Sequence, residues 1–247
     1  MKSARMIAIF KEGNRTDPGN YRPISILPVI SKILERIAHM QLMDYCTENS
    51  LLSDAQSGFR KSHSTQTSLL RMTERVYSSL NSGHFVGMVA LDLKKAFDTV
   101  NHEILIDKLD YYGVHGATKL WFKDYLSNRS QYAAINGQLS DSKQIRTGVP
   151  QGSILGSLLF IIYVNDIPVC INSSEANMYA DDTAFYYSNT KLSEVETHLQ
   201  SDLTNVAVWL SCNKLSLNVS KTVSMVICSH QKKPTQVSDK LISSVKI

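Results

Sequence analysis

Residues 176–187, ANMYADDTAFYY, place two adjacent carboxylates, Asp181 and Asp182, between strand-forming residues. The pattern predicts a β-hairpin with both carboxylates at its bend. Adjacent carboxylates repel each other, so the pair either raises a pKa or recruits a cation. Simple turn formation is the alternative explanation, since Asp is common in turns.

A third carboxylate, Asp92, follows a strand-like segment earlier in the chain. Residues 85–93, FVGMVALDL, form an apolar run broken only by Gly87, which predicts a buried strand ending at Asp92. Magnesium prefers oxygen ligands and usually takes one or two protein carboxylates, with water and phosphates completing its shell. A third acid at a second strand end would complete a two-metal site. A helix cap or an exposed loop residue is the alternative for Asp92.

The rest of the chain mixes helices and strands without regular βαβ alternation, which predicts an α+β fold with helices packed on an antiparallel sheet. Apolar periodicity predicts helices that begin near residues 28, 65, 102, 119, 153 and 192. QYAAING is expected to be a strand closed by an Asn136-Gly137 turn. Two short strands are expected within residues 215–230, whereas the segment before residue 28 is polar and rich in turn residues.

Composition sets broad limits on the class of protein. With 247 residues, 43% of them apolar and 19% charged, the chain can form one large domain or two small ones. A net charge of +4 is mild for a nucleic-acid-binding protein. Four scattered cysteines without zinc-site spacing, and no signal-peptide pattern, favour an intracellular setting in the cytoplasm or nucleus. The longest apolar run, residues 154–164, is too short to cross a bilayer, so no membrane partner is expected.

Six segments together resemble the reverse transcriptase domain of non-LTR retrotransposons, the jockey, CR1 and LINE-like group. They are, in order, NYRPISILPVISKILERI, LLSDAQSGFRKSHST, VALDLKKAFDTVNHEIL, GVPQGSILGSLLFIIYVNDI, MYADDTAFY and WLSCNKLSLNVSKT. The resemblance covers nearly the whole chain and implies an RNA-directed DNA polymerase. Its implied partners are an RNA template, a DNA primer and dNTPs.

The resemblance also implies a right-hand polymerase fold with fingers and palm, in a single reverse transcriptase domain over residues 1–247. Residues 1–84 would be mainly fingers, and residues 85–230 mainly palm with a fingers insertion. Residues 231–247 would be a polar tail or the start of a truncated thumb. The thumb would then be largely missing, and a thumb or endonuclease could come from the full-length element protein.

By the same resemblance, Asp92, Asp181 and Asp182 are catalytic and hold two Mg²⁺ ions, for which Mn²⁺ can substitute. These ions lie between the primer 3′-hydroxyl and the incoming triphosphate during nucleotidyl transfer. Asp92 and Asp181 are expected to be the indispensable ligands, with Asp182 nearer the primer end. The main-chain carbonyl of Leu93 is expected to add a further oxygen ligand.

Other residues are expected to contact the substrates. Phe97 would lie beneath the incoming sugar and exclude a 2′-hydroxyl, which favours deoxynucleotides over ribonucleotides. Gln151 and Gly152, in the loop GVPQG, would lie against the nascent base pair, and Tyr179 would pack beside the primer end. The alternatives are a core Phe, an ordinary turn before a helix, and a core Tyr in a hairpin.

Basic residues complete the expected site. Arg60 is expected to reach the triphosphate, because its planar fork suits phosphate oxygens. Lys221 matches a late palm lysine of the family, a candidate general acid near the leaving pyrophosphate, although a lone Lys is commonly a solvated charge.

Asp98 is expected to be a local cap or salt-bridge residue. Ser157 stands where the family usually has Pro, which puts local packing in question rather than chemistry.

Two other functions remain open from the sequence. One is a polymerase-inactive remnant that keeps the fold and only binds nucleic acid. The other is an RNA-dependent RNA polymerase with the same palm chemistry, which the aromatic Phe97 disfavours. Use of ribonucleotides would separate this second alternative from a reverse transcriptase.

Overall fold

The computed structural model describes residues 2–135 and 137–229, and the chain forms two compact units. The first unit comprises Met1–Leu52 and Lys95–Tyr163, and the second comprises Ser53–Lys94 and Val164–Ile247. The assignment of residues to fingers and palm stays a prediction. The expected tail or thumb start at 231–247, and Asn136 of the expected Asn-Gly turn, lie outside the described residues.

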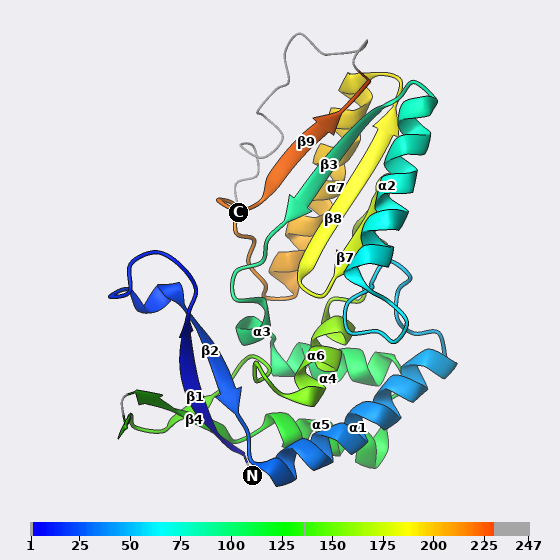
Figure 1. Cartoon of the computed structure of the whole chain (residues 1–247). Helices are drawn as coiled ribbons and strands as arrows, with labels where there is room; N and C mark the ends of the chain where they lie inside the picture. The colour runs from blue at the N-terminus through cyan, green and yellow to red at the C-terminus, as the bar shows by residue number, and fades with distance from the viewer. Residues whose placement is uncertain (1, 136, 230–247) are drawn as a thin grey trace. The chain divides into compact units, whose positions relative to one another are not determined.

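The second unit is built on a four-stranded antiparallel sheet with the order β7-β8-β3-β9 (Figure 1). Its strands are β3 (Phe85–Leu91), β7 (Glu175–Tyr179), β8 (Asp182–Asn189) and β9 (Val223–Ile227). The expected antiparallel sheet is therefore present. Of the two strands expected within residues 215–230, only β9 forms in the described part of that segment. The earlier segment meets the chain after β3 in a single bridge between Leu93 and Leu217, too short to count as a strand.

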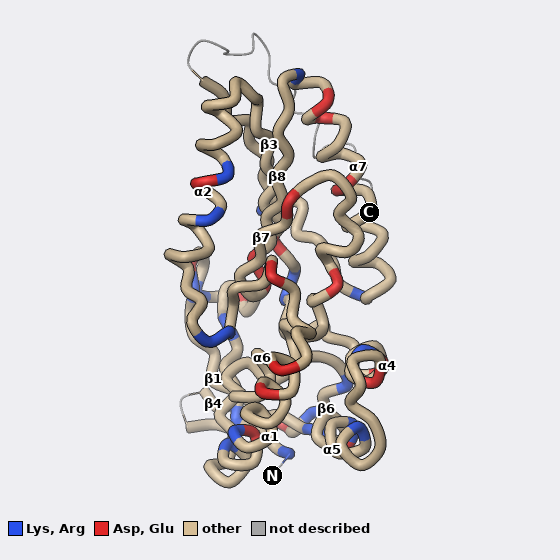
Figure 2. Tube along the Cα trace, turned by 90° about the vertical axis from the view of Figure 1, so that its right-hand side faces the viewer, with Lys and Arg blue, Asp and Glu red and all other residues tan. Residues whose placement is uncertain are grey.

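Two long helices cover opposite faces of this sheet (Figure 2). They are α2 (Thr65–Asn81) and α7 (Leu192–Cys212), and α7 also contacts the short 3₁₀ helix η2 (Ile167–Cys170). Both helices begin where apolar periodicity predicts them.

Alternate residues of β3 face the two helices, which explains why the strand is apolar on both of its faces. Val86 and Met88 pack in a cluster with apolar residues of α2. Gly87 faces α7, where a Cβ atom would lie only 2.4 Å from the Cδ1 atom of Leu199 and 2.5 Å from the Cγ1 atom of Val195. The glycine therefore permits the close approach of α7 to the sheet.

The first unit combines a mixed sheet with helices. Its strands are β1 (Ser3–Phe10), β2 (Tyr21–Ile26), β4 (Arg129–Ile135), β5 (Gln138–Leu139) and β6 (Lys143–Ile145), in the order β2-β1-β4-β5 with β6 also paired to β4. Its helices are η1 (Pro18–Asn20), α1 (Val29–Glu48), α3 (Ala96–Thr99), α4 (His102–Tyr111), α5 (Gly116–Leu126) and α6 (Ile154–Tyr163). The sequence did not predict β1 and β2, because β1 pairs in parallel with β4, more than a hundred residues away.

Helix α6 forms the centre of the first unit, and eight of its ten residues are buried. The carboxylate of Glu35, which is 1% exposed, accepts hydrogen bonds from the Ile154 N–H (2.9 Å) and the Tyr125 hydroxyl (2.8 Å). Glu35 thus satisfies a free N–H at the start of α6. Helix α6 continues through Ser157, whose hydroxyl donates to the Ile154 carbonyl at 3.1 Å. In the described ranges, no helix combines the length and apolar character that a membrane span requires.

Candidate active site

The hairpin of β7 and β8 carries the two adjacent acids at its bend, as predicted. Tyr179 pairs with Asp182, which leaves Ala180 and Asp181 as a two-residue loop. Ala180 has a φ of +60°, whereas Asp181 does not have a positive φ. This combination is the type II′ pattern, whose first loop position is normally Gly. Ala180 therefore has a backbone conformation that is unfavourable for residues with a Cβ atom.

Asp92 lies beside this hairpin at the end of β3. The register of β3 and β8 runs to the pair Leu91 and Thr183, so Asp92 and Asp182 are the next residues along the two strands. Asn218 binds Asp92 twice: its side-chain amide donates to Asp92 Oδ2 at 2.6 Å, and its N–H donates to the Asp92 carbonyl at 2.7 Å. The Asp92 N–H donates to the Thr222 hydroxyl at 3.3 Å. The segment after α7 therefore orients the Asp92 carboxylate.

Asp182 lies close enough to the other two carboxylates to be affected by their charges. Partial burial, followed by the negative charges of Asp181 and Asp92, raises the pKa of Asp182 above its ordinary value. Within the described residues, no three His, Cys, Asp or Glu side chains form a ready-made metal cage. The donor chemistry still fits a hard divalent cation, because magnesium needs only one or two carboxylates and takes its other ligands from water and phosphates.

Replacing Asp182 with Asn is expected to raise the melting temperature of the metal-free protein at pH 7 by about 1–2 °C, because it removes a charge that Asp181 and Asp92 repel, an effect that solvent screening reduces at this exposed position. The folded-state pKa of Asp182 is raised above 3.8, so the native protein gains stability as this carboxylate takes up a proton. The advantage of the variant should therefore shrink as the pH falls towards 3.8. Circular dichroism melts with a chelator at pH 7 and pH 4 check this, and an equal advantage at both pH values would contradict it.

Four other predicted site residues lie in the second unit: Tyr179, Leu93, Lys221 and Arg60. Tyr179 is the half-buried last residue of β7, and Leu93 is buried against Leu217. Lys221 is exposed, in the turn that follows Asn218. The substrate and ligand roles of these residues stay predictions.

Arg60 has a defined part in its own loop. Its Nη1 atom donates to the carbonyl oxygens of Ser53, at 2.8 Å, and Gln56, at 3.0 Å. The guanidinium therefore stabilises the loop formed by residues 53–60. The contact of Arg60 with the triphosphate, expected from the sequence, stays a prediction.

The first unit contains the other predicted substrate residues. Phe97 and Gln151 both contact neighbouring side chains there. The Phe97 ring stacks on Phe160, with 4.3 Å between ring centroids. The Gln151 side-chain amide donates to Asp98 Oδ1 at 3.0 Å. The Val149 N–H donates to the Phe97 carbonyl at 2.8 Å. Asp98 therefore orients Gln151, a role that the sequence did not indicate.

Glycines allow this loop to approach its neighbours. Gly148 has a φ of +86°, and a Cβ atom there would lie 2.7 Å from the Asp98 carbonyl oxygen. Gly152 has a φ of +102°, and a Cβ atom would lie 2.9 Å from the Ser25 carbonyl oxygen. Both positions therefore need glycine for backbone conformation and for space. The expectation that Gly152 lies against a nascent base pair stays a prediction.

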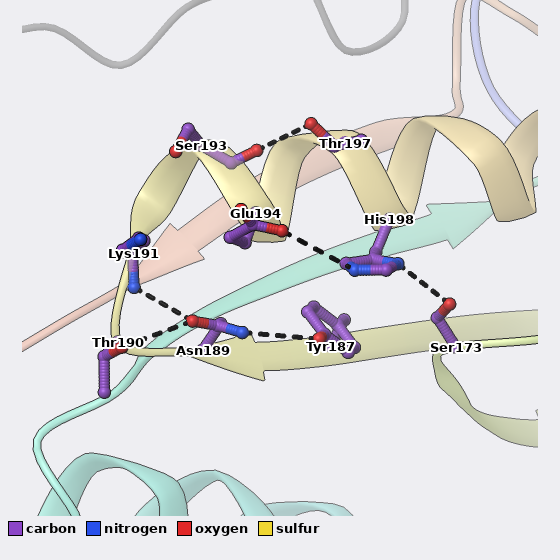
Figure 3. A network of polar contacts seen from close by, with 9 residues as sticks. All are labelled: Ser173, Tyr187, Asn189, Thr190, Lys191, Ser193, Glu194, Thr197 and His198. Carbon is purple, nitrogen blue, oxygen red and sulfur yellow. Dashed lines mark hydrogen bonds and ion pairs between the residues drawn. The ribbon is translucent and has the colours of Figure 1, made fainter.

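A second chemistry-bearing group lies on α7 and the loop before β7 (Figure 3). Nδ1 of His198 is 2.9 Å from the Ser173 hydroxyl, and its Nε2 atom is 3.8 Å from Glu194. This order of groups resembles a Ser-His-acid triad. However, the Ser173 N–H, which could stabilise an oxyanion, donates to the buried carboxylate of Asp202. The group therefore fastens the loop to α7, and the structure assigns it no catalytic role.

A hairpin that carries paired acids on an antiparallel sheet, with a third acid at the adjacent strand end, fits the right-hand polymerase fold expected from the sequence. Solved telomerases show the same fold. The apo telomerase of Candida tropicalis truncated from its C-terminal domain matches 95% of this chain and 51% of its own, at a TM-score of 0.64 and 13% identity. The telomerase of the same organism in complex with a TWJ fragment of telomeric RNA matches 91% of this chain and 41% of its own, at a TM-score of 0.62 and 13% identity.

The chain belongs to the reverse transcriptase family: the family model described as "Reverse transcriptase (RNA-dependent DNA polymerase)" matches residues 9–238. The probable RNA-directed DNA polymerase from transposon BS of Drosophila melanogaster is 35% identical over 90% of this chain and 25% of its own length. The RNA-directed DNA polymerase from mobile element jockey of the same species is 29% identical over 92% of this chain and 26% of its own. The resemblance to non-LTR retrotransposon enzymes is thus confirmed. The chain spans about a quarter of the length of these relatives.

Proposed function

We propose that this chain is the RNA-directed DNA polymerase domain of a non-LTR retrotransposon protein, which adds dNTPs to a primer 3′-hydroxyl. The observation that carries the proposal is the gathering of Asp92, Asp181 and Asp182 at the ends of two paired strands in a chain of this family. Nucleotidyl transfer depends on positioning and charge neutralisation, and carboxylates that hold cations provide both. An RNA template and a DNA primer are the proposed partners, supported by the names of the relatives.

Reverse transcriptases as a family use divalent metals, and we propose Mg²⁺ here, with Mn²⁺ as a substitute. Asp92 and Asp181 would hold two Mg²⁺ ions, with Asp182 beside them. When bound, two such ions lower the pKa of the primer hydroxyl and neutralise charge on the phosphates. Asn218 donates to one Asp92 oxygen at 2.6 Å and so directs the carboxylate. This bond prepares the carboxylate for the cation before substrate arrives.

Proton transfer to the leaving pyrophosphate is proposed for Lys221, whose exposed position leaves its side chain accessible. Contacts of Arg60 with the triphosphate and of Tyr179 with the primer end are part of the same proposal. The roles of Phe97, Gln151 and Gly152, which belong to the first unit, stay predictions. So does the intracellular setting expected from the sequence.

The proposal is tested by primer extension on an RNA template with Mg²⁺, with dNTPs or rNTPs as substrates and with template binding measured in parallel. Extension with dNTPs that EDTA abolishes while binding persists is the expected result. Binding without extension would make the chain a polymerase-inactive remnant. Preferential use of rNTPs would instead identify an RNA polymerase.

A further inference from the structure

The bend that carries Asp181 is clamped by a segment more than a hundred residues earlier in the sequence. Residues 55–57 lie in parallel beside the end of β7. The Met178 N–H donates to the Ala55 carbonyl at 2.8 Å, and the Ser57 N–H donates to the Met178 carbonyl at 2.8 Å. Gln56, between these two bonds, is fully buried at 0% exposure.

The side-chain amide of Gln56 pairs with both backbone groups of Ala180. Its Oε1 atom accepts from the Ala180 N–H at 2.9 Å, and its Nε2 atom donates to the Ala180 carbonyl at 3.3 Å. The same Oε1 atom accepts from the Gly58 N–H at 2.7 Å. One side chain therefore fixes the two peptide planes that flank Ala180, and the second of these planes leads directly into Asp181.

Gly58 makes this arrangement sterically possible. A Cβ atom at Gly58 would lie 2.2 Å from the Ala180 nitrogen and 2.9 Å from Gln56 Oε1. The nearest of these atoms belongs to the backbone, which cannot rotate away. Gly58 is therefore needed to bring the clamp against the bend.

The conformation of Ala180 explains why the bend needs a clamp. Its φ of +60° lies in the left-handed region, which an alanine adopts only under restraint from its surroundings. Loss of the restraint would let the bend relax towards an ordinary turn, and the first side chain to move would be that of Asp181. Both acids of the bend are already held against mutual repulsion.

We propose that Gln56 is a positioning residue of the polymerase site: by clamping the backbone of Ala180 it holds Asp181 where a divalent cation can bind. This inference rests on the proposed function. It assigns a role to the AQSG part of the segment SDAQSGFR, for which the sequence indicated only Arg60.

The decisive variant is Gln56→Met, which keeps the approximate length of the side chain and removes all three amide hydrogen bonds. Gln56→Glu retains an oxygen that can accept from the Ala180 and Gly58 N–H groups, loses the donor to the Ala180 carbonyl, and is the conservative partner. Ser68→Ala is the matched control: the buried Ser68 hydroxyl donates to Asn177 of β7 at 2.7 Å, so the control also loses a buried hydrogen bond to the hairpin, away from its bend. All three variants are compared with the native chain at equal folded fraction, from circular dichroism.

Three measurements are made on each protein. They are kcat and KM for dNTP in primer extension, Mn²⁺ binding without nucleic acid by electron paramagnetic resonance, and hydrogen exchange of a peptide spanning residues 176–185. For Gln56→Met we expect kcat to fall about 100-fold, since small misplacements of catalytic groups have effects of this size. Its KM should stay within about twofold of the native value. Mn²⁺ binding should weaken and the peptide should exchange faster, whereas Gln56→Glu should recover part of the loss and Ser68→Ala should leave kcat and Mn²⁺ binding unchanged.

Equal losses of kcat in Gln56→Met and Ser68→Ala would overturn the proposal, because Gln56 would then act only through stability. A native chain that extends no primer would refute the proposed function, but Mn²⁺ binding would still decide the role of Gln56. Weaker Mn²⁺ binding in Gln56→Met alone would support the clamp. Unchanged Mn²⁺ binding in that variant would refute it.

Discussion

Replacing Asp181 with Asn is expected to lower the rate of primer extension by about 1,000-fold, the scale on which loss of a charge-stabilising group in an active site acts. The amide keeps the size of the side chain and its place in the two-residue loop between Tyr179 and Asp182. It removes the negative charge that would hold a cation against the substrate phosphates. The hairpin itself should persist, because Asn favours turns as Asp does.

Single-turnover extension on an RNA template, with template binding measured by fluorescence anisotropy, checks this expectation. Asp54→Asn is the matched control, since Asp54 is an exposed acid of the same unit outside the hairpin. It should extend primers at the native rate. If Asp181→Asn also extended primers at the native rate, the three acids would not be the catalytic site.

Replacing Asp202 with Ala is expected to reduce the free energy of unfolding by about 3 kcal/mol, because several backbone donors lose a charged acceptor together. The Asp202 side chain is 0% exposed. It accepts from the N–H groups of Asn172 (2.9 Å), Ser173 (3.2 Å to Oδ2) and Ser174 (2.8 Å). These bonds fasten the residues that lead into β7 against α7, and so support the strand that leads to the bend with Asp181.

Urea unfolding followed by circular dichroism measures the effect. Ser201→Ala changes the neighbouring exposed residue on α7 and should shift the free energy of unfolding by no more than about 0.5 kcal/mol. Asp202→Asn, which retains one accepting oxygen, should fall between the two. Equal stability of Asp202→Ala and Ser201→Ala would show that the loop finds other acceptors.

Several elements could be predicted because their causes are local. Apolar periodicity indicated α2 and α7, and the acids flanked by strand-forming residues indicated the hairpin of β7 and β8. The run before Asp92 indicated β3, since a strand buried on both faces is apolar throughout. Each of these patterns lies within about twenty consecutive residues, and the structure confirms each element.

Other features depend on residues that are far apart in the sequence. Strand β1 pairs with β4, and nothing in the sequence of β1 indicates that β4 is its partner. The two compact units are each built from two separate stretches of chain, which no change in composition marks. Asp98 was expected to be a local cap or salt-bridge residue, yet it accepts a hydrogen bond from Gln151, 53 residues away.

The sequence by itself determined which acids stand at strand ends, and therefore which ligands the proposed cation would meet. The tertiary structure decided how those acids are held. Asn218 reaches Asp92 across 126 residues, and Gln56 reaches Ala180 across 124. Residue type and short-range periodicity can be read along a chain, whereas a hydrogen bond between distant residues exists only once the fold brings donor and acceptor to within about 3 Å of each other.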